Sequence, residues 1–131
     1  MQPSPELRVA AVQSPILWNE PEANLRYIEE QLRGQGTADL LVFPETILTG
    51  FSATAADYAD REGLQLEELS RLARHYGKAL AGSLLTTLEG QLYNAFFLID
   101  EEGQVQLQPK RHLFAPGGER GYVQPATERR I

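Results

Sequence analysis

Blocks of apolar residues along the chain predict buried strands and amphipathic helices. Short apolar runs with the length of a buried strand lie at residues 7–13, 40–43 and 79–86. Between them, apolar residues recur at helical spacing over 25–32 and again over 66–76. Strands and helices are therefore expected to alternate over the first two-thirds of the chain.

Glycine and proline residues mark the ends of these predicted elements. Pro21 fits the first turn of a helix, where its missing N–H costs nothing, after Asn19 or Glu20 as a possible cap. Gly34 and Gly77 follow the two helical segments at the positions where helices commonly end. The spacing thus predicts one helix from about residue 21 to 34 and a second that ends near residue 76.

Two more apolar runs, at residues 93–99 and 105–108, predict a meander that follows the third strand. Glu89-Gly90 is expected to form the first hairpin turn, and the run 100–103 the second. Residues 115–131 are rich in glycine, proline and charge and are expected to be loop.

The resulting order, β-α-β-α-β-β-β, predicts one α/β domain over residues 1–131 with a mixed sheet. Two helices can cover only one face of such a sheet. We expect another part of the protein, C-terminal to these residues, to cover the second face.

Composition and charge narrow the possible partners. The formal net charge of −6 disfavours nucleic acid or an anionic membrane surface as the main partner. No apolar run has the length of a membrane span, and the N-terminus lacks the features of a signal peptide, so a cytoplasmic protein is expected. The chain has no cysteine and two histidines, so we expect no disulfide, no cysteine-bound metal and no histidine-rich metal site.

Glu45 is the first candidate for chemistry. A buried strand runs into Phe43-Pro44, and the proline presents Glu45 at the carboxyl end of that strand, where open α/β sheets bind ligands. A half-buried carboxylate there could act as a general base. An ordinary acidic loop residue or a helix cap would fit the same spacing.

Lys110 is the second candidate, because it too ends a predicted strand. An ammonium beside a reacting carbonyl stabilises a developing oxyanion, although a solvated tip of a hairpin would also place a lysine there. His112 is interpreted as a structural hydrogen-bonding residue, since no nucleophile or metal ligand lies near it in sequence.

Residues 117–122 supply the third candidate, Glu119. Gly117 and Gly118 would let the backbone approach a ligand, and Glu119 could pair with Lys110 or hold a substrate group. The segment is a poor phosphate loop, because it lacks the Gly-Lys-Ser/Thr ending.

Four segments together resemble the nitrilase superfamily of carbon–nitrogen hydrolases. They are LRVAAVQSPILWNEPEANL, LLVFPETILTGFS, LYNAFFLIDEEG and PKRHLF, in that order from residue 7 to 114, and the resemblance extends to Tyr122. It implies a Glu-Lys-Cys mechanism, in which Glu45 and Lys110 match the family glutamate and lysine. Such a mechanism needs no metal and no organic cofactor. Glu119 matches a second glutamate that many members carry. The segment around Glu45 most resembles the ω-amidase branch, which implies a small ω-amide as substrate.

The family cysteine has no counterpart among these residues. The resemblance implies that the chain is the first half of a four-layer α-β-β-α sandwich, inactive alone, and that the protein is a homo-oligomer or associates with the cysteine-bearing half. Two other readings stay open: a non-catalytic nitrilase-like binding or assembly module, and an unrelated α/β ligand-binding domain.

Overall fold

A mixed sheet of five strands, in the order β1-β2-β3-β4-β5, forms the centre of the computed structural model, which describes residues 5–131. The strands are β1 (Val9–Ala11), β2 (Leu40–Val42), β3 (Ala79–Leu88), β4 (Gln91–Ile99) and β5 (Val105–Pro109). The first three run parallel to one another, and β4 and β5 add antiparallel pairs. The predicted α/β class and mixed sheet are confirmed.

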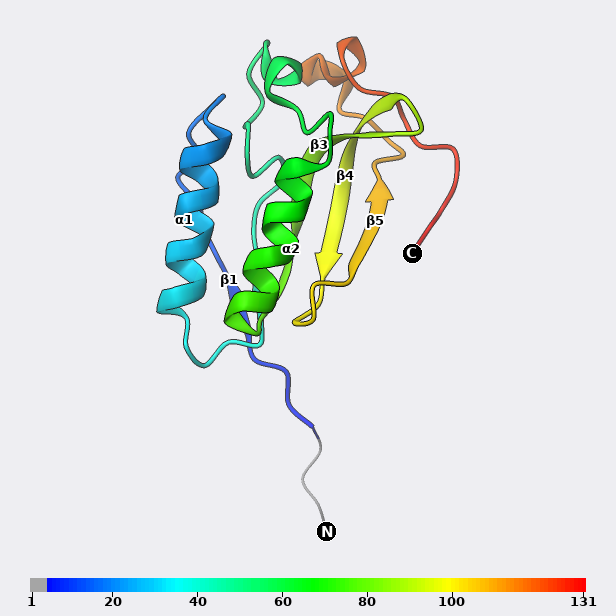
Figure 1. The fold of residues 1–131 in the computed structure, drawn as a ribbon. Helices are drawn as coiled ribbons and strands as arrows, with labels where there is room; N and C mark the ends of the chain where they lie inside the picture. The colour runs from blue at the N-terminus through cyan, green and yellow to red at the C-terminus, as the bar shows by residue number, and fades with distance from the viewer. Residues whose placement is uncertain (1–4) are drawn as a thin grey trace.

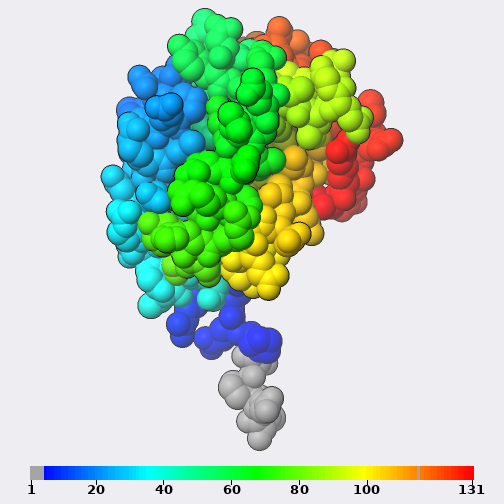
Figure 2. Space-filling view, viewed as in Figure 1, coloured from blue at the N-terminus to red at the C-terminus, as the bar shows by residue number. Residues whose placement is uncertain are grey.

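Two helices, α1 (Pro21–Gly34) and α2 (Leu64–Tyr76), lie side by side on one face of the sheet (Figure 1). Their side chains close over this face in the space-filling view (Figure 2). Between helices and sheet lies the main core, whose fully buried side chains include Ile28, Leu69, Leu80 and Phe97. No helix among residues 5–131 has both the length and the apolarity needed to cross a membrane.

The helix ends follow the predicted signals. Pro21 occupies the first turn of α1, and Gly77 ends α2 in the left-handed conformation at φ 63°. Helix α2 begins at Leu64, slightly before the apolar pattern that predicted it. Its first turn is held by the buried Asp60, whose carboxylate accepts the backbone N–H groups of Gln65 and Leu66 at 3.0 and 2.9 Å.

Several strand ends differ from the prediction by one or two residues, and β1 differs at both ends. Strand β1 is shorter than the apolar run 7–13, because within residues 5–131 its only strand partner is the short β2, which ends at Val42, before Pro44. Strand β3 continues to Leu88 and turns into β4 through Glu89-Gly90, both at positive φ, as the predicted hairpin requires.

Residues 5–131 also contain three short 3-10 helices, which lie outside the predicted helices and strands. They are η1 (Ala55–Tyr58), η2 (Ala115–Gly117) and η3 (Glu119–Gly121). A single 3-10 turn is too short to leave an apolar period in the sequence. The expectation of loop over 115–131 is therefore right for most of that segment but wrong at η2 and η3.

The sheet face opposite the helices carries apolar side chains that are partly open to solvent. Side chains alternate between faces along a strand, so Phe97 is fully buried against the helices while Phe96 is 41% exposed on the other side. Val42 is similarly exposed on β2. That another part of the protein covers this face stays a prediction.

Gly50, in the loop that follows Glu45, lies close to the side chain of Trp18. Its φ is 67°, and its N–H donates to the carbonyl of Thr46 at 2.9 Å. A Cβ built at Gly50 would lie 2.1 Å from Cδ1 of Trp18, the only tryptophan in the sequence. Glycine is therefore required here both for its φ and for the space that the indole ring occupies.

Gly50→Ala is predicted to lower the free energy of unfolding by about 2 kcal/mol or more, because it adds a steric clash to the cost of positive φ. Gly63→Ala is the matched control: Gly63 has φ 78° and no atom within 4 Å of a built Cβ, so only the φ cost of about 1 kcal/mol is expected. Chemical denaturation measures both. Trp18 fluorescence should change in Gly50→Ala alone, and an unchanged spectrum would contradict the packing.

Candidate active site

Glu45 is held at the end of β2 by hydrogen bonds from the following residues to β3. The backbone N–H of Thr46 donates to the hydroxyl of Ser83 at 2.8 Å, and the N–H of Ile47 donates to the carbonyl of Ser83 at 3.0 Å. Together with Pro44, which fixes its own φ, these bonds set the direction in which Glu45 leaves the sheet.

Thr46 adopts a conformation that β-branched residues rarely take. Its φ is 49°, and its hydroxyl donates to the carbonyl of Glu45 at 2.8 Å. Positive φ in such a residue costs on the order of 1–3 kcal/mol and persists only where the surroundings enforce it. The strain lies directly beside the candidate base, as is common at functional sites.

Lys110 reaches the same place from the end of β5. Its backbone N–H donates to the carbonyl of Asn94 on β4 at 2.7 Å. Its Nζ lies 2.7 Å from Oε1 of Glu45 and 3.0 Å from Oε1 of Glu119. The segments after β2 and after β5 thus meet at one end of the sheet (Figure 1), and one ammonium contacts both carboxylates.

Glu119 is the buried member of this group, with 2% of its surface exposed. Gly118, at φ 75°, turns the chain into η3 and so directs Glu119 inward. Its Oε1 accepts the backbone N–H of Phe114 at 2.8 Å, and its Oε2 accepts Nδ2 of Asn94 at 2.8 Å. The predicted contact between Glu119 and Lys110 is present.

Asn94 is a site residue that the sequence analysis missed. It is 1% exposed, and its Nδ2 also donates to Oε1 of Glu45 at 2.7 Å. The available signal was a single amide side chain within the apolar run 93–99. An amide at a buried strand position needs polar partners, and here those partners are the two carboxylates.

The charges of this group are one ammonium and two carboxylates. Burial opposes the charge on Lys110, but its hydrogen bonds to Glu45 and Glu119 outweigh burial and raise the pKa of Lys110. Burial likewise opposes the charge on Glu119, yet bonds from Asn94, Phe114 and Lys110 hold its pKa below the ordinary value. Lys110 is therefore a cation and Glu119 an anion at neutral pH.

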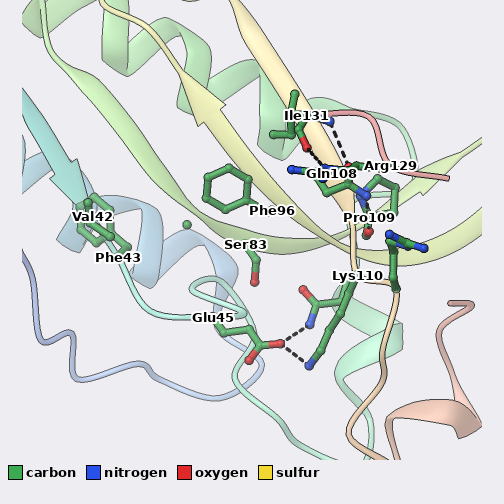
Figure 3. Close-up of a pocket in the computed structure, with 13 residues that line it drawn as sticks. Val42, Phe43, Glu45, Ser83, Phe96, Gln108, Pro109, Lys110, Arg129 and Ile131 are labelled. Carbon is green, nitrogen blue, oxygen red and sulfur yellow. Dashed lines mark hydrogen bonds and ion pairs between the residues drawn. The ribbon is translucent and has the colours of Figure 1, made fainter. Parts of the chain in front are cut away.

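A cavity of about 530 Å³ opens beside these residues on the sheet face away from the helices (Figure 3). Val42, Phe43 and Phe96 give it an apolar wall, and Glu45, Asn94 and Lys110 border it as polar groups. Figure 3 shows one oxygen of Glu45 joined to Lys110. Residues 5–131 donate no hydrogen bond to Oε2 of Glu45. The carboxylate of Glu45 and the ammonium of Lys110 therefore border one space.

Two polar residues near Lys110 in the sequence play no part in this group. The side chain of His112 is exposed and makes no hydrogen bond to residues 5–131, so its interpretation as a structural hydrogen-bonding residue stays a prediction. Arg111 lines the cavity and forms no ion pair with a carboxylate of the described chain. Within residues 5–131 no group of acidic, cysteine or histidine side chains could hold a metal ion.

Comparison with known proteins identifies the family of this chain. The family model for carbon–nitrogen hydrolase matches residues 8–130. The chain is 30% identical over 127 residues to omega-amidase YafV of Escherichia coli K12, a match that covers 97% of this chain and 50% of that protein. The chain spans about half the length of the curated relatives it matches.

Solved structures show the same fold. XC1258 from Xanthomonas campestris, a CN-hydrolase superfamily protein, superposes with a TM-score of 0.85 and 31% identity over 93% of this chain and 47% of its own. An amidase from Nesterenkonia, in a variant whose active-site cysteine has added acrylamide, superposes with a TM-score of 0.80 and 25% identity over 94% and 51%. The chain belongs to the carbon–nitrogen hydrolase family.

Proposed function

We propose that this chain supplies the base and the oxyanion-stabilising cation of a cysteine-dependent amidase that acts on small ω-amides. The main support for this proposal is the contact between Lys110 Nζ and Glu45 Oε1, at 2.7 Å, beside an open cavity. The likeness to an omega-amidase and to an amidase with an active-site cysteine supports the reaction class. None of the 131 residues is a cysteine, so the nucleophile belongs to another segment.

In the proposed reaction the cysteine sulfur forms a bond to the amide carbon while Glu45 takes the thiol proton. Lys110 stabilises the negative oxygen of the tetrahedral intermediate. When the carbon–nitrogen bond breaks, the nitrogen leaves as ammonia with the proton from Glu45. A water then attacks the thioester carbon while Glu45 takes one of its protons. The carbon–sulfur bond breaks, and Glu45 returns that proton to the sulfur, which restores the thiol and releases the acid. The overall reaction is amide plus water to acid plus ammonia.

The position and charge of Arg111 favour a substrate that carries a carboxylate. It borders the cavity from the residue next to Lys110, and the described carboxylates leave its charge uncompensated. An ω-amide of a dicarboxylic acid has its amide at one end and its carboxylate at the other. The amide would lie at Lys110 and the carboxylate at Arg111, which binds such a group through charge-assisted hydrogen bonds.

Two further expectations accompany this proposal. Homo-oligomerisation, or association with the cysteine-bearing half, would cover the exposed sheet face around Phe96. A cytoplasmic location stays a prediction.

Glu45→Gln and Lys110→Ala are each predicted to abolish turnover, lowering kcat by at least about 10³-fold. The enzyme assayed is the product of the whole reading frame that encodes residues 1–131, with ammonia release from an ω-amide as the readout. Residues 1–131 alone should release none, because they contain no cysteine.

Glu101→Gln is the control for the same chemical change, because Glu101 lies in an exposed turn, and it should keep full turnover. Full activity in Glu45→Gln or Lys110→Ala would contradict the role given to that residue. An inactive product of the whole reading frame would favour the binding or assembly module instead.

Arg111→Gln is predicted to lower kcat/KM for a carboxylate-bearing ω-amide by about 10- to 100-fold, the loss of a charge-assisted hydrogen bond. Turnover of the matching uncharged alkyl amide should stay the same. Arg26→Gln, at an exposed position on α1, is the control. An equal decrease in kcat/KM for both substrates would show that Arg111 does not bind the substrate carboxylate.

A further inference from the structure

One amide nitrogen bridges the two carboxylates of the site. Nδ2 of Asn94 lies 2.7 Å from Oε1 of Glu45 and 2.8 Å from Oε2 of Glu119. An amide NH₂ has two hydrogens to donate, so each carboxylate receives one. The assignment of nitrogen rather than oxygen to this position follows from its partners, because both are carboxylate oxygens that can only accept when ionised.

The bridge determines which oxygen of Glu45 stays available. Lys110 Nζ and Asn94 Nδ2 both engage Oε1, each at 2.7 Å. No residue among 5–131 donates to Oε2, and the Glu45 side chain is 41% exposed. A carboxylate with one oxygen doubly engaged presents the other as its proton acceptor.

The bridge also offsets repulsion. Two carboxylates that share one ammonium leave an uncompensated negative charge, and like charges at this range disfavour ionisation of both. Lys110 contacts the two from one side at 2.7 and 3.0 Å. Asn94 contacts the same two without adding charge, from a strand position that is 1% exposed.

We propose that Asn94 is a positioning residue of the amidase site, which locks Oε1 of Glu45 and Oε2 of Glu119 together and so leaves Oε2 of Glu45 as the oxygen that exchanges protons with the nucleophile, the leaving group and water. Asn94 itself contacts no reacting atom in this role. The inference rests on the proposed function for its kinetic consequence, whereas the electrostatic consequence can be measured on the 131-residue chain.

Burial alone raises the folded-state pKa of a carboxyl introduced at position 94, because this position is 1% exposed. A bridge to two carboxylates adds a second cause, which weakens when one of the two carboxylates is removed. The carboxyl introduced by Asn94→Asp has two carboxylate neighbours, which raise its folded-state pKa above its unfolded value. The free energy of unfolding of Asn94→Asp is therefore closest to that of wild type at low pH. It decreases relative to wild type as pH rises from about 4 through the folded-state pKa of the new carboxyl.

The test measures the pH dependence of the free energy of unfolding that Asn94→Asp adds to the 131-residue chain, once in the wild-type background and once in a Glu45→Gln background. Glu45→Gln removes the charge of one carboxylate that Asn94 contacts and leaves position 94 on its strand. The loss of stability with rising pH is expected to be smaller in the Glu45→Gln background. Equal pH dependence in the two backgrounds would overturn the inference.

Asn94→Ala serves where Asn94→Asp does not fold, because it removes the donor without adding charge. Its readout is the carboxyl ¹³C titration of Glu119 by NMR, which should shift to higher pH as one of its hydrogen bonds is lost. An unshifted titration would overturn the inference.

In the product of the whole reading frame, Asn94→Ala should lower kcat by about 100-fold while KM stays within about threefold, as expected for a misplaced catalytic group. Unchanged kcat beside an active wild type would overturn the positioning role. An inactive wild type would instead overturn the proposed function, and the stability and NMR results would still decide whether Asn94 holds the carboxylates.

Discussion

The ammonium of Lys110 between two carboxylates is the interaction on which the site depends. Glu119 is buried, and a buried carboxylate is costly unless charge and hydrogen bonds compensate it. Lys110 supplies the charge, and Asn94 and the N–H of Phe114 supply the bonds. The same ammonium holds Glu45 at the edge of the cavity. Loss of Lys110 would therefore leave the carboxylate of Glu119 buried without a cation. It would also remove the contact that holds Glu45 at the edge of the cavity.

The fold serves this interaction by bringing three separate segments to one end of the sheet. Asn94 lies 49 residues from Glu45 and 25 from Glu119 along the chain. The pairing of β3 with β4, and of β4 with β5, sets Asn94 beside Lys110, while Ser83 on β3 anchors the strained turn at Thr46. The helices stabilise the opposite face and contribute no residue to the cavity, so the face with the cavity and the helix-packed face are distinct.

Much of this could be predicted from the sequence, for identifiable reasons. The helices and the hairpin followed from apolar periodicity and from local signals such as Pro21, Gly77 and Gly90, which act within a few residues. Glu45 and Lys110 were found because each follows a strand end and matches a family segment. Asn94 was missed because its role depends on strand register and on two distant carboxylates, which no local pattern encodes. The 3-10 turn that directs Glu119 inward was missed because it is too short to leave a period.

An NMR titration of the Lys110 ammonium and the Glu119 carboxyl in the 131-residue chain would measure whether the two groups form one ion pair. Lys110 should lose its proton above the ordinary lysine pKa of about 10.4, and the pKa of Glu119 should lie below the ordinary glutamate value of about 4.3, because each group stabilises the charged form of the other. A lysine pKa below its ordinary value, together with a glutamate pKa above its own, would show two desolvated groups without a shared ion pair and would rule out the arrangement described for the site.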